Sequence, residues 1–359
     1  MKGLILAGGL GTRLRPLSHT GPKQLIPIAN KPVLHYIIED LRDAGITDIG
    51  IIVGYTPERI KYITDSCGDG SKFGVKITYI EQDAPRGLAH AVYTAKEFLN
   101  DADFAVYLGD NILSNGIKEY AENFKNSNFD AGVLLSEVED PRIYGVGVLD
   151  KKGELIEIEE KPKHPKSKLA VVGVYFFKAS IFDIIKRLNV GKGGELQLTD
   201  AIKLMLKSSH YKIKANIVKG WWDDTGTAEA VLRANHLTLM KLKHNIEGIV
   251  EKGVSITGVV NIGKGTIIKK GTIIKGPVII GKNCIIGPNS FIGSFTSIGD
   301  GTEIVNGEIE SSIVLGECRI NFNEKIVDSL IGKNVKILSQ NKLPKGHKLL
   351  LGEHSEVIL

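Results

Sequence analysis

Residues 256–304 read ITGVVN IGKGTI IKKGTI IKGPVI IGKNCI IGPNSF IGSFTS IGDGTE I in blocks of six, and each block begins with isoleucine. Neither an α-helix nor a simple strand imposes such a strict six-residue spacing on nine isoleucines. In a hexapeptide repeat, each unit forms one short parallel strand and a turn, and three units complete a triangular coil. The stretch therefore predicts a left-handed parallel β-helix with its isoleucines stacked along the axis.

Glycine directly follows the repeating isoleucine in five blocks, and we expect it there because a tight corner favours a residue that tolerates positive φ. After Ile304 the spacing slips, and we interpret residues 305–312 as a loop extruded from the β-helix. The apolar positions that resume the pattern, some of them one residue out of phase, are Val314, Ile320, Ile326, Ile331 and Ile337.

The chain before the repeats alternates short apolar runs with amphipathic stretches. We expect strands at residues 3–6, 49–53, 77–79, 105–108, 131–135, 145–149, 171–177 and 213–218. Helical patterns lie at residues 33–43, 57–66, 88–98, 117–126, 181–188 and 198–205. This alternation predicts an α/β domain with a mixed, mostly parallel sheet, in which ligands bind beyond the carboxyl ends of the strands.

The change of period sets the expected domain boundaries. We divide the chain into an α/β domain (1–235), a connecting helix or linker (236–250), the β-helix (251–340) and a C-terminal tail (341–359). The stretch 227–244 has the pattern of a helix that joins the two domains.

Composition excludes several classes of protein. No apolar run approaches the roughly 20 residues of a membrane span, and the short apolar run after Met1 and Lys2 is not a signal peptide, so we expect a cytoplasmic protein without a membrane partner. The net charge of +5 comes from scattered lysines, which does not indicate nucleic-acid binding but suits anionic small substrates. Cys67, Cys284 and Cys318 are too far apart to suggest a zinc site or disulfides.

A glycine-rich loop follows the first expected strand. Gly8, Gly9 and Gly11 would let the backbone fold closely around phosphate oxygens, although a tight strand-to-helix turn would explain them as well. The loop is neither a Walker A motif nor a Rossmann fingerprint. Arg13 and Lys23 favour the phosphate-binding interpretation, because two cations near the loop would neutralise a triphosphate.

The stretch LAGGLGTRLRPL (6–17), followed by PKQLIPI (22–28), resembles the signature of the sugar-1-phosphate nucleotidyltransferases. The Lys-Gln pair is similar to that of the glucose-1-phosphate thymidylyltransferases in particular, whose long form also carries a β-helix. The resemblance implies a Rossmann-like nucleotidyltransferase fold and catalytic role for residues 1–235. It implies nucleotide binding by Leu6, Gly8, Gly9, Gly11, Thr12, Arg13, Lys23 and Gln24.

The segment around Gln82, Pro85 and Gly87 resembles the part of the family that recognises the base. The amide of Gln82 can donate and accept at once, which suits the paired oxygen and N–H edge of thymine or uracil. Gly87 would let the backbone approach the ring. We interpret His90 as a helix residue near this site.

Two carboxylates are candidates for a Mg²⁺ site, Asp110 at the end of an expected buried strand and Asp224 in the sequence WWDDTG. We choose Asp224 over its neighbour Asp223 because it matches the family's Trp-x-Asp-Thr-Gly order. Asp110 is expected to contact the nucleotide as well. The resemblance places the sugar phosphate against Gly145, Glu160, Lys161, Gly173 and Trp222, and leaves a functional or structural role for Glu195 equally open.

The family's chemistry implies in-line attack of glucose 1-phosphate on the α-phosphorus of dTTP, which yields dTDP-glucose and pyrophosphate. Positioning and charge neutralisation would provide the catalysis. The expected catalytic residues are Arg13, Lys23, Asp110, Lys161 and Asp224.

Several alternatives remain. The sequence discriminates poorly between a dTTP-dependent enzyme and one that uses UTP or both nucleotides. A mannose 1-phosphate guanylyltransferase fits the motifs less well. An acyltransferase activity of the β-helix would need a histidine base, and residues 251–340 contain none, so we interpret the β-helix as a structural or assembly module. A catalytically dead paralogue is disfavoured because the catalytic motif residues are retained. We also expect a homo-oligomer, formed through the β-helix, the catalytic domain or both.

Overall fold

The computed structural model describes residues 1–19, 21–54, 56–191, 194–339 and 357. The chain forms two compact units. The first comprises Met1–Gly11, Gly21–Leu25 and Val33–Asp224, and the second comprises Thr12–Thr20, Ile26–Pro32 and Thr225–Leu359. Apart from Val357, the expected C-terminal tail (341–359) lies outside the described residues.

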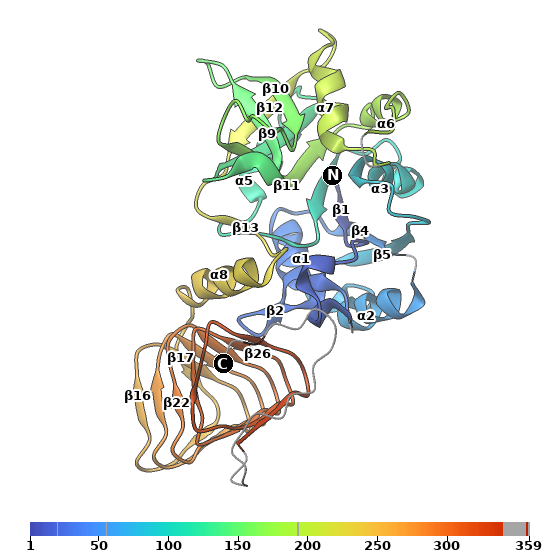
Figure 1. Cartoon of the computed structure of the whole chain (residues 1–359). Helices are drawn as coiled ribbons and strands as arrows, with labels where there is room; N and C mark the ends of the chain where they lie inside the picture. Colours follow the sequence, from blue (N-terminus) through green and yellow to red (C-terminus); the bar gives the residue numbers. More distant parts are fainter. Residues whose placement is uncertain (20, 55, 192–193, 340–356, 358–359) are drawn as a thin grey trace. The chain divides into compact units, whose positions relative to one another are not determined.

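The first unit is built on a nine-stranded sheet (Figure 1). Its parallel part follows the order β6 (Phe104–Leu108), β1 (Lys2–Leu6), β4 (Asp48–Val53) and β5 (Lys76–Glu81). Leu6 at the end of β1 is in register with Leu108 at the end of β6 and with Ile52 near the end of β4. The carboxyl ends of these strands therefore share one edge of the sheet.

The sheet continues beyond β6 with mostly antiparallel strands. β11 (Leu169–Phe177) pairs antiparallel with β6, β8 and β9. The remaining strands are β8 (Ala131–Glu137), β9 (Gly145–Leu149), β10 (Leu155–Glu160) and β12 (Ile213–Ile217). The α/β prediction with a mixed sheet is confirmed. The sequence did not indicate β10, because only its residues Leu155 and Ile158 are buried and charged residues alternate with them.

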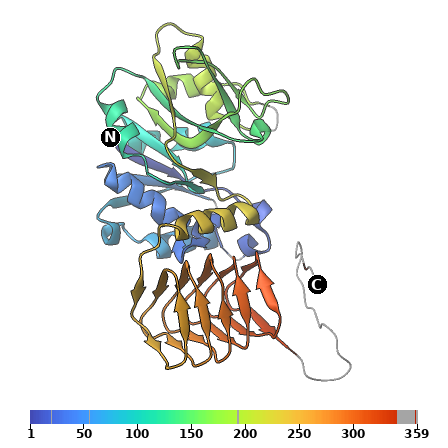
Figure 2. The ribbon, with the colours of Figure 1, turned by 90° about the vertical axis from the view of Figure 1, so that its left-hand side faces the viewer.

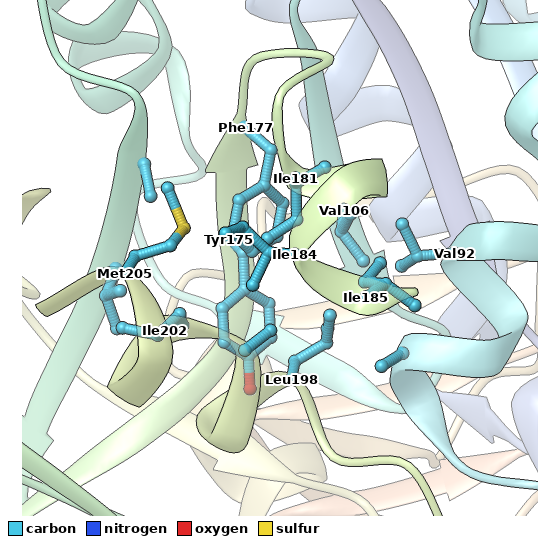
Figure 3. Close-up of a cluster of buried hydrophobic side chains, with 14 of the residues drawn as sticks. Val92, Val106, Tyr175, Phe177, Ile181, Ile184, Ile185, Leu198, Ile202 and Met205 are labelled. Atoms are coloured by element: carbon cyan, nitrogen blue, oxygen red, sulfur yellow. The ribbon is translucent and has the colours of Figure 1, made fainter. Parts of the chain in front are cut away.

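Helices of this unit pack their apolar faces on the sheet. They are α1 (Val33–Asp43), α2 (Pro57–Cys67), α3 (Leu88–Thr94), α4 (Lys96–Leu99), α5 (Lys118–Lys125), α6 (Ile181–Ile185) and α7 (Leu198–Leu206). The helix expected at 88–98 is interrupted at Ala95, which separates α3 from α4. Figure 3 shows the core in which α6 and α7 meet β11 through Ile184, Met205 and Phe177.

The second unit contains the β-helix, whose strands form three parallel sheets. The first sheet is β14 (Asn245–Ile246), β17 (Val260–Ile262), β20 (Val278–Ile280), β23 (Thr296–Ile298), β26 (Ile313–Val314) and β29 (Leu330–Ile331). The second is β15 (Ile249–Val250), β18 (Ile267–Ile268), β21 (Ile285–Ile286), β24 (Glu303–Val305), β27 (Arg319–Asn321) and β30 (Lys336–Leu338). The third is β16 (Ser255–Thr257), β19 (Ile273–Lys275), β22 (Phe291–Ile292), β25 (Glu308–Glu310) and β28 (Lys325–Val327).

The repeating isoleucines fill the interior of these coils. Residues 262, 268, 274, 280, 286, 292, 298 and 304 are at most 1 % exposed, and they form one continuous apolar cluster. The left-handed β-helix prediction is confirmed.

The loop predicted at residues 305–312 is wrong. This segment contains β25, which pairs in parallel with β22 and with β28, and Ile309 is completely buried. Ile309 follows Ile304 by five residues instead of six, so one corner of the coil is shorter by a residue. The corner is tighter there, and the segment remains part of the β-helix.

Four of the five glycines that follow the isoleucines have a different role from the one expected, and the fifth, Gly287, has the expected positive φ. Gly287 has a φ of +99°, whereas Gly263, Gly281, Gly293 and Gly299 do not have positive φ. A Cβ at Gly299 would lie 2.6 Å from the amide nitrogen of Gly316 on the next coil. These four glycines therefore permit close stacking of successive coils, and do not supply a left-handed corner.

The second unit also includes α8 (Ala228–Leu239) and the hairpin of β2 (Pro27–Ile28) and β3 (Lys31–Pro32). Thr227 is the N-cap of α8, where its hydroxyl accepts a hydrogen bond from the amide of Ala230, and the helix ends at Leu239, before the expected His244. Figure 2 shows α8 running along the β-helix across its coils. Within the described residues, none of the helices combines the length and apolar character needed to cross a bilayer.

Candidate active site

The parallel part of the sheet carries a pocket at the carboxyl ends of its strands. The nine of its lining residues that match the predicted nucleotide contacts are Leu6, Gly8, Gly9, Lys23, Gln24, Gln82, Pro85, Gly87 and Asp110. The others are Ile52, Leu88, Ala91, Leu108 and Glu195, of which the sequence singled out only Glu195, as a residue of open role. The shared strand register explains why segments so distant in sequence meet here.

The glycine loop packs on the side chain of Lys23. Gly11 has a φ of +67°, and a Cβ built there would lie 3.0 Å from the Cβ of Lys23. At Gly9 the same construction lies 3.6 Å from Lys23 Cε. A side chain at position 11 would thus strain the backbone and displace the lysine. The loop holds the lysine stem in place, and its residues Gly8 and Gly9 line the pocket.

Lys23 forms an ion pair with Asp110, and both side chains are largely buried, at 15 % and 16 % exposure. Asn111 Nδ2 donates a second hydrogen bond to Asp110, 2.9 Å from Oδ1. Burial alone would raise the pKa of Asp110, but the Lys23 ammonium and the Asn111 amide hold that pKa below its ordinary value. Asp110 is therefore an ionised carboxylate in the folded protein at neutral pH.

A small two-stranded ladder brings Asp224 to the same place. β13 (Trp222–Asp224) pairs antiparallel with β7 (Asn111–Leu113), and this register sets Asp224 opposite Asn111, the neighbour of Asp110. Asp223 lies opposite Ile112 and is only 3 % exposed. Asp224 is the more exposed member of the pair, although the residues that line the pocket include Asp110 and not Asp224.

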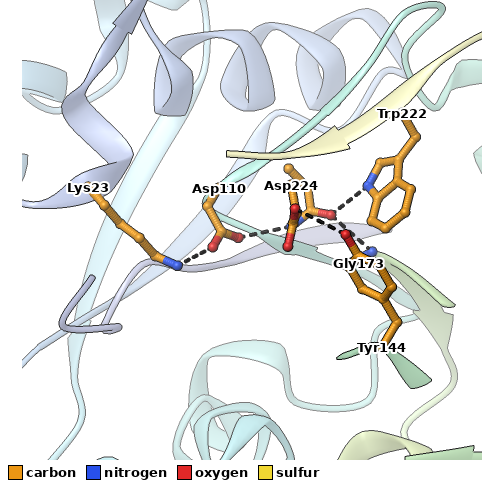
Figure 4. A network of polar contacts seen from close by, with 7 residues as sticks. Lys23, Asp110, Tyr144, Gly173, Trp222 and Asp224 are labelled. Carbon is orange, nitrogen blue, oxygen red and sulfur yellow. Dashed lines mark hydrogen bonds and ion pairs between the residues drawn. The ribbon is translucent and has the colours of Figure 1, made fainter. Parts of the chain in front are cut away.

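Asn111 joins this ladder to the rest of the site through its side-chain hydrogen bonds. Figure 4 shows Tyr144, Trp222 and Asp224 gathered beside Asp110. Asn111 Oδ1 accepts a hydrogen bond of 2.7 Å from Trp222 Nε1 and one of 3.3 Å from the amide of Gly173. Tyr144 donates from its hydroxyl to Asp224 Oδ1 at 3.3 Å. Its ring meets that of Trp222 edge-on at 5.3 Å. The sequence analysis did not single out Asn111 or Tyr144, and adjacency to Asp110 and Gly145 was the only signal for them.

Gln82 is on the opposite side of the pocket and is 8 % exposed. Its Nε2 is 3.1 Å from Nδ1 of His90 on α3. A Cβ at Gly8 would lie 3.2 Å from Gln82 Oε1, so the glycine makes room for the amide. Gly87 has a φ of +98°, and a Cβ there would lie 2.7 Å from the backbone nitrogen of Leu196. The positive φ and the nearby backbone of Leu196 therefore require glycine at position 87, independently of any contact with a nucleotide base.

The predicted sugar-binding residues form a second group along β9, β10 and β11. Thr199 donates a hydrogen bond of 2.8 Å to Glu160 Oε2, and a Cβ at Gly145 would lie 2.8 Å from the methyl group of Thr199. Burial raises the pKa of Glu160, although the hydrogen bond from Thr199 and the charge of Lys161 oppose this. A further hydrogen-bond donor would therefore stabilise the ionised form of the Glu160 carboxylate.

Lys161 and Gly173 complete this group. Lys161 is exposed, has a φ of 43°, and donates its backbone amide to the carbonyl of Tyr144 at 3.0 Å. A Cβ at Gly173 would lie 2.7 Å from Leu108 and 2.8 Å from Asn111 Cγ. Glycine at 173 is thus needed for packing between β6 and β11.

Thr12 and Arg13 are exposed and belong to the second compact unit, in the short turn Thr12–Leu14. Their contacts with the nucleotide stay a prediction. In the part of the chain that the structure describes, no group of three or more His, Cys, Asp or Glu side chains is arranged to hold a metal.

Residues 2–241 match the model of the family described as Nucleotidyl transferase. The chain belongs to this family. Residues 259–294 match the bacterial transferase hexapeptide family (six repeats). The predicted family is confirmed, and the chain is a nucleotidyltransferase with a hexapeptide β-helix.

Curated relatives of this nucleotidyltransferase align along its full length. The low-salt glycan biosynthesis nucleotidyltransferase Agl11 of Haloferax volcanii is 46 % identical over 360 residues, covering 100 % of both chains. A glucose-1-phosphate thymidylyltransferase of Streptomyces antibioticus is 44 % identical and covers 99 % of both. Among solved structures, a Bacillus anthracis chain named as a glucose-1-phosphate thymidylyltransferase, in complex with a sucrose, is 39 % identical with a TM-score of 0.63. It covers 68 % of this chain and 97 % of its own.

Proposed function

We propose that this nucleotidyltransferase transfers a deoxythymidylyl group from dTTP to α-D-glucose 1-phosphate, giving dTDP-glucose and pyrophosphate. The observation that carries the proposal is one pocket that joins the glycine loop, the Lys23–Asp110 pair and Gln82. Such a pocket offers backbone amides and a cation to phosphates, a carboxylate to a metal, and an amide to a base. The Streptomyces antibioticus relative supports the choice of nucleotide and sugar.

The carboxylates fit Mg²⁺, because Asp110 is ionised and Asp224 lies across the ladder from Asn111. Mg²⁺ takes few protein carboxylates and keeps places for substrate phosphates and waters. When bound, it would neutralise charge on the nucleotide phosphates. Asp110 and Asp224 would hold the cation, and the ammonium of Lys23, which is paired with Asp110 in this structure, would lie close enough to neutralise substrate phosphates.

The transfer itself needs no protein nucleophile. A phosphate oxygen of glucose 1-phosphate attacks the α-phosphorus of dTTP, the bond to the bridging oxygen breaks, and pyrophosphate leaves. Lys161 would hold the attacking phosphate, and Arg13 would stabilise charge on the leaving pyrophosphate. Positioned cations of this kind act on charge that develops in the transition state.

Sugar recognition would fall to the Glu160 group. The Glu160 carboxylate has Thr199 as one donor and is otherwise largely desolvated, so sugar hydroxyls are favourable partners. Trp222 is fixed by Asn111 and Tyr144 and offers an apolar ring face for the hexose. Gln82 would read the base, through an amide held against His90.

The test is a substrate panel with the purified full-length protein. Each of ATP, CTP, GTP, UTP and dTTP is incubated with glucose 1-phosphate, mannose 1-phosphate and N-acetylglucosamine 1-phosphate, with and without Mg²⁺, and pyrophosphate and sugar nucleotides are measured. We expect Mg²⁺-dependent dTDP-glucose as the fastest product. A faster reaction with UTP would make the enzyme a uridylyltransferase, and product without Mg²⁺ would contradict the metal assignment.

A further inference from the structure

The family signature at residues 6–28 is divided between the two compact units. Gly8, Gly9, Lys23 and Gln24 are in the first unit, whereas residues 12–19 and 26–32 are in the second, with the β-helix. Leu25 is the last residue of the segment that carries Lys23, and Ile26 begins the hairpin of β2 and β3. What holds that hairpin therefore also restrains the chain that bears Lys23.

The hairpin is fastened through Asn235, a residue of α8 that is only 1 % exposed. The amide of Ala29, at the tip of the hairpin, donates to Asn235 Oδ1 at 2.8 Å. The hydroxyl of Ser297 on β23 donates to the same oxygen at 2.7 Å, and Asn235 Nδ2 donates to the carbonyl of Phe295 at 3.1 Å. One buried carboxamide thus links the hairpin, α8 and one β-helix coil.

Neighbouring contacts reinforce this link. Asn30 Nδ2 donates to the carbonyl of Ile298 at 2.7 Å, so the hairpin tip has a second hydrogen bond to the same coil. His236, next to Asn235, stacks on Phe295 with ring centroids 3.4 Å apart. Leu17, in the other signature segment of this unit, packs against Gly332, where a Cβ would lie 3.3 Å from its Cδ2. Both signature segments of this unit therefore rest on the β-helix.

We propose that Asn235 is a positioning residue for nucleotide turnover: by fastening the 26–32 hairpin to the β-helix, it fixes the backbone that presents Lys23 and Gln24 to the pocket. The inference rests on the proposed function for its kinetic consequence. It gives the β-helix a part in catalysis in addition to any role in assembly.

The segment between the hairpin and Lys23 is short and stiff. Lys23 is three residues before Ile26, and the intervening turn is closed by the hydrogen bond from the amide of Leu25 to the carbonyl of Pro22 at 3.0 Å. A chain this short and closed transmits a shift of the hairpin to the lysine. Misplacement of a catalytic group by about 1 Å can cost on the order of 100-fold in rate.

The experiment compares Asn235→Ala with Ile286→Val, which removes one methyl group from the β-helix core and leaves the hairpin contacts intact. For each protein we measure kcat and KM for dTTP at saturating Mg²⁺ and glucose 1-phosphate, the thermal midpoint, and hydrogen exchange of residues 22–32. We expect Asn235→Ala to lose about tenfold or more in kcat/KM for dTTP and to exchange faster at residues 22–32. Ile286→Val should lose thermal stability while keeping its kinetics and its exchange at 22–32.

A second variant keeps the inference testable if Asn235→Ala does not fold. Asn30 has a φ of 60°, which glycine adopts without strain, so Asn30→Gly removes only the hydrogen bond to Ile298. It should show a smaller loss of kcat/KM in the same direction, with faster exchange at residues 22–32.

The inference is overturned if Asn235→Ala, or Asn30→Gly in its place, matches Ile286→Val in kcat/KM and leaves exchange at 22–32 unchanged. If the wild-type protein makes no product with any nucleotide and sugar phosphate, the proposed function fails instead. The exchange measurement then still decides whether Asn235 fastens the hairpin.

Discussion

At the scale of single residues, the groups around Asp110 determine the charge of its carboxylate in the pocket. Lys23 and Asn111 both favour the ionised carboxylate and lower its pKa in the folded state. A depressed pKa contributes stability above the unfolded value, near 3.9 for aspartate, and this contribution is lost as the pH falls through the folded pKa. The carboxylate is thus stabilised at neutral pH, where a divalent cation needs it.

Asp110→Asn is expected to lower kcat by on the order of 10² to 10³ while the protein stays folded. The asparagine side chain still has an oxygen that can accept from Asn111, but it lacks the negative charge that pairs with Lys23 and that a divalent cation would require. Steady-state kinetics and thermal unfolding check this. Asp183→Asn on α6, whose carboxylate is 79 % exposed, is the matched control and should behave as wild type. Near-normal turnover of Asp110→Asn would remove this residue from the mechanism.

Glu160 gives a prediction for stability against pH. Burial raises its pKa in the folded state, so its contribution to stability is present below the unfolded pKa, near 4.3, and is lost as the pH rises through the folded pKa. Glu160→Gln avoids that loss and keeps an oxygen to accept from Thr199. The thermal midpoint of Glu160→Gln relative to wild type should therefore be higher at pH 7 than at pH 4.5. An equal difference at both pH values would show that the carboxylate is not desolvated as described.

The sequence predicted site residues best where the residue types in a motif point to one kind of chemistry. The grouping of the glycine loop, Lys23 and Asp110 could be predicted, and the structure places them around one pocket. Their roles toward phosphate and metal stay predictions. Asn111 could not be predicted, because its importance comes from the β7–β13 ladder, and pairing of two three-residue strands leaves no periodic pattern. The contribution of Gly173 to packing was equally invisible, since it depends on how closely Leu108 approaches from β6.

At the scale of elements, the β-helix shows what a periodic pattern can and cannot predict. The six-residue spacing predicted the coils, but residues 305–312 were assigned to a loop because the spacing there falls to five. Ile309 still faces the interior, since β25 pairs with strands on both sides. Burial of the isoleucine side chain outweighs the loss of one corner residue.

Two substitutions in β25 test this correction. Ile309→Ala removes a completely buried side chain and should cost about 2–5 kcal/mol in unfolding free energy. Glu308→Ala, one residue earlier, changes a side chain that points outward and should have little effect. Thermal or denaturant unfolding of the two variants decides the matter. Equal, small effects would indicate that the segment is a loop after all.

The close approach of the coils offers a further test at this scale. A Cβ at Gly299 would lie 2.6 Å from the backbone of Gly316, so Gly299→Ala has to push two coils apart. We expect a loss of stability of about 1–3 kcal/mol from this overpacking. Gly153→Ala is no neutral comparison, since that glycine has a φ of +80°, but Gly21→Ala is, because nothing lies within 4 Å of the position. A Gly299→Ala protein as stable as Gly21→Ala would contradict the stacking argument.

At the scale of the whole molecule, one sequence signature is divided between the two compact units, and part of it belongs to the unit that contains the β-helix. The segments that precede and follow the Lys23 turn both contact the β-helix, through Leu17 and through Asn235. The homo-oligomer expected from the sequence stays a prediction. Sedimentation velocity of the purified protein would measure the subunit number, and a monomer would rule the expectation out.

We propose that Asp110 and Asp224 together hold a metal-bound nucleoside triphosphate. The most direct measurement is equilibrium binding of Mn²⁺, monitored by electron paramagnetic resonance, in the presence of dTTP. Wild-type protein should immobilise Mn²⁺ together with dTTP, and Asp110→Asn and Asp224→Asn should each weaken this binding by about tenfold or more. Mn²⁺ binding of wild-type strength in both variants would contradict the account.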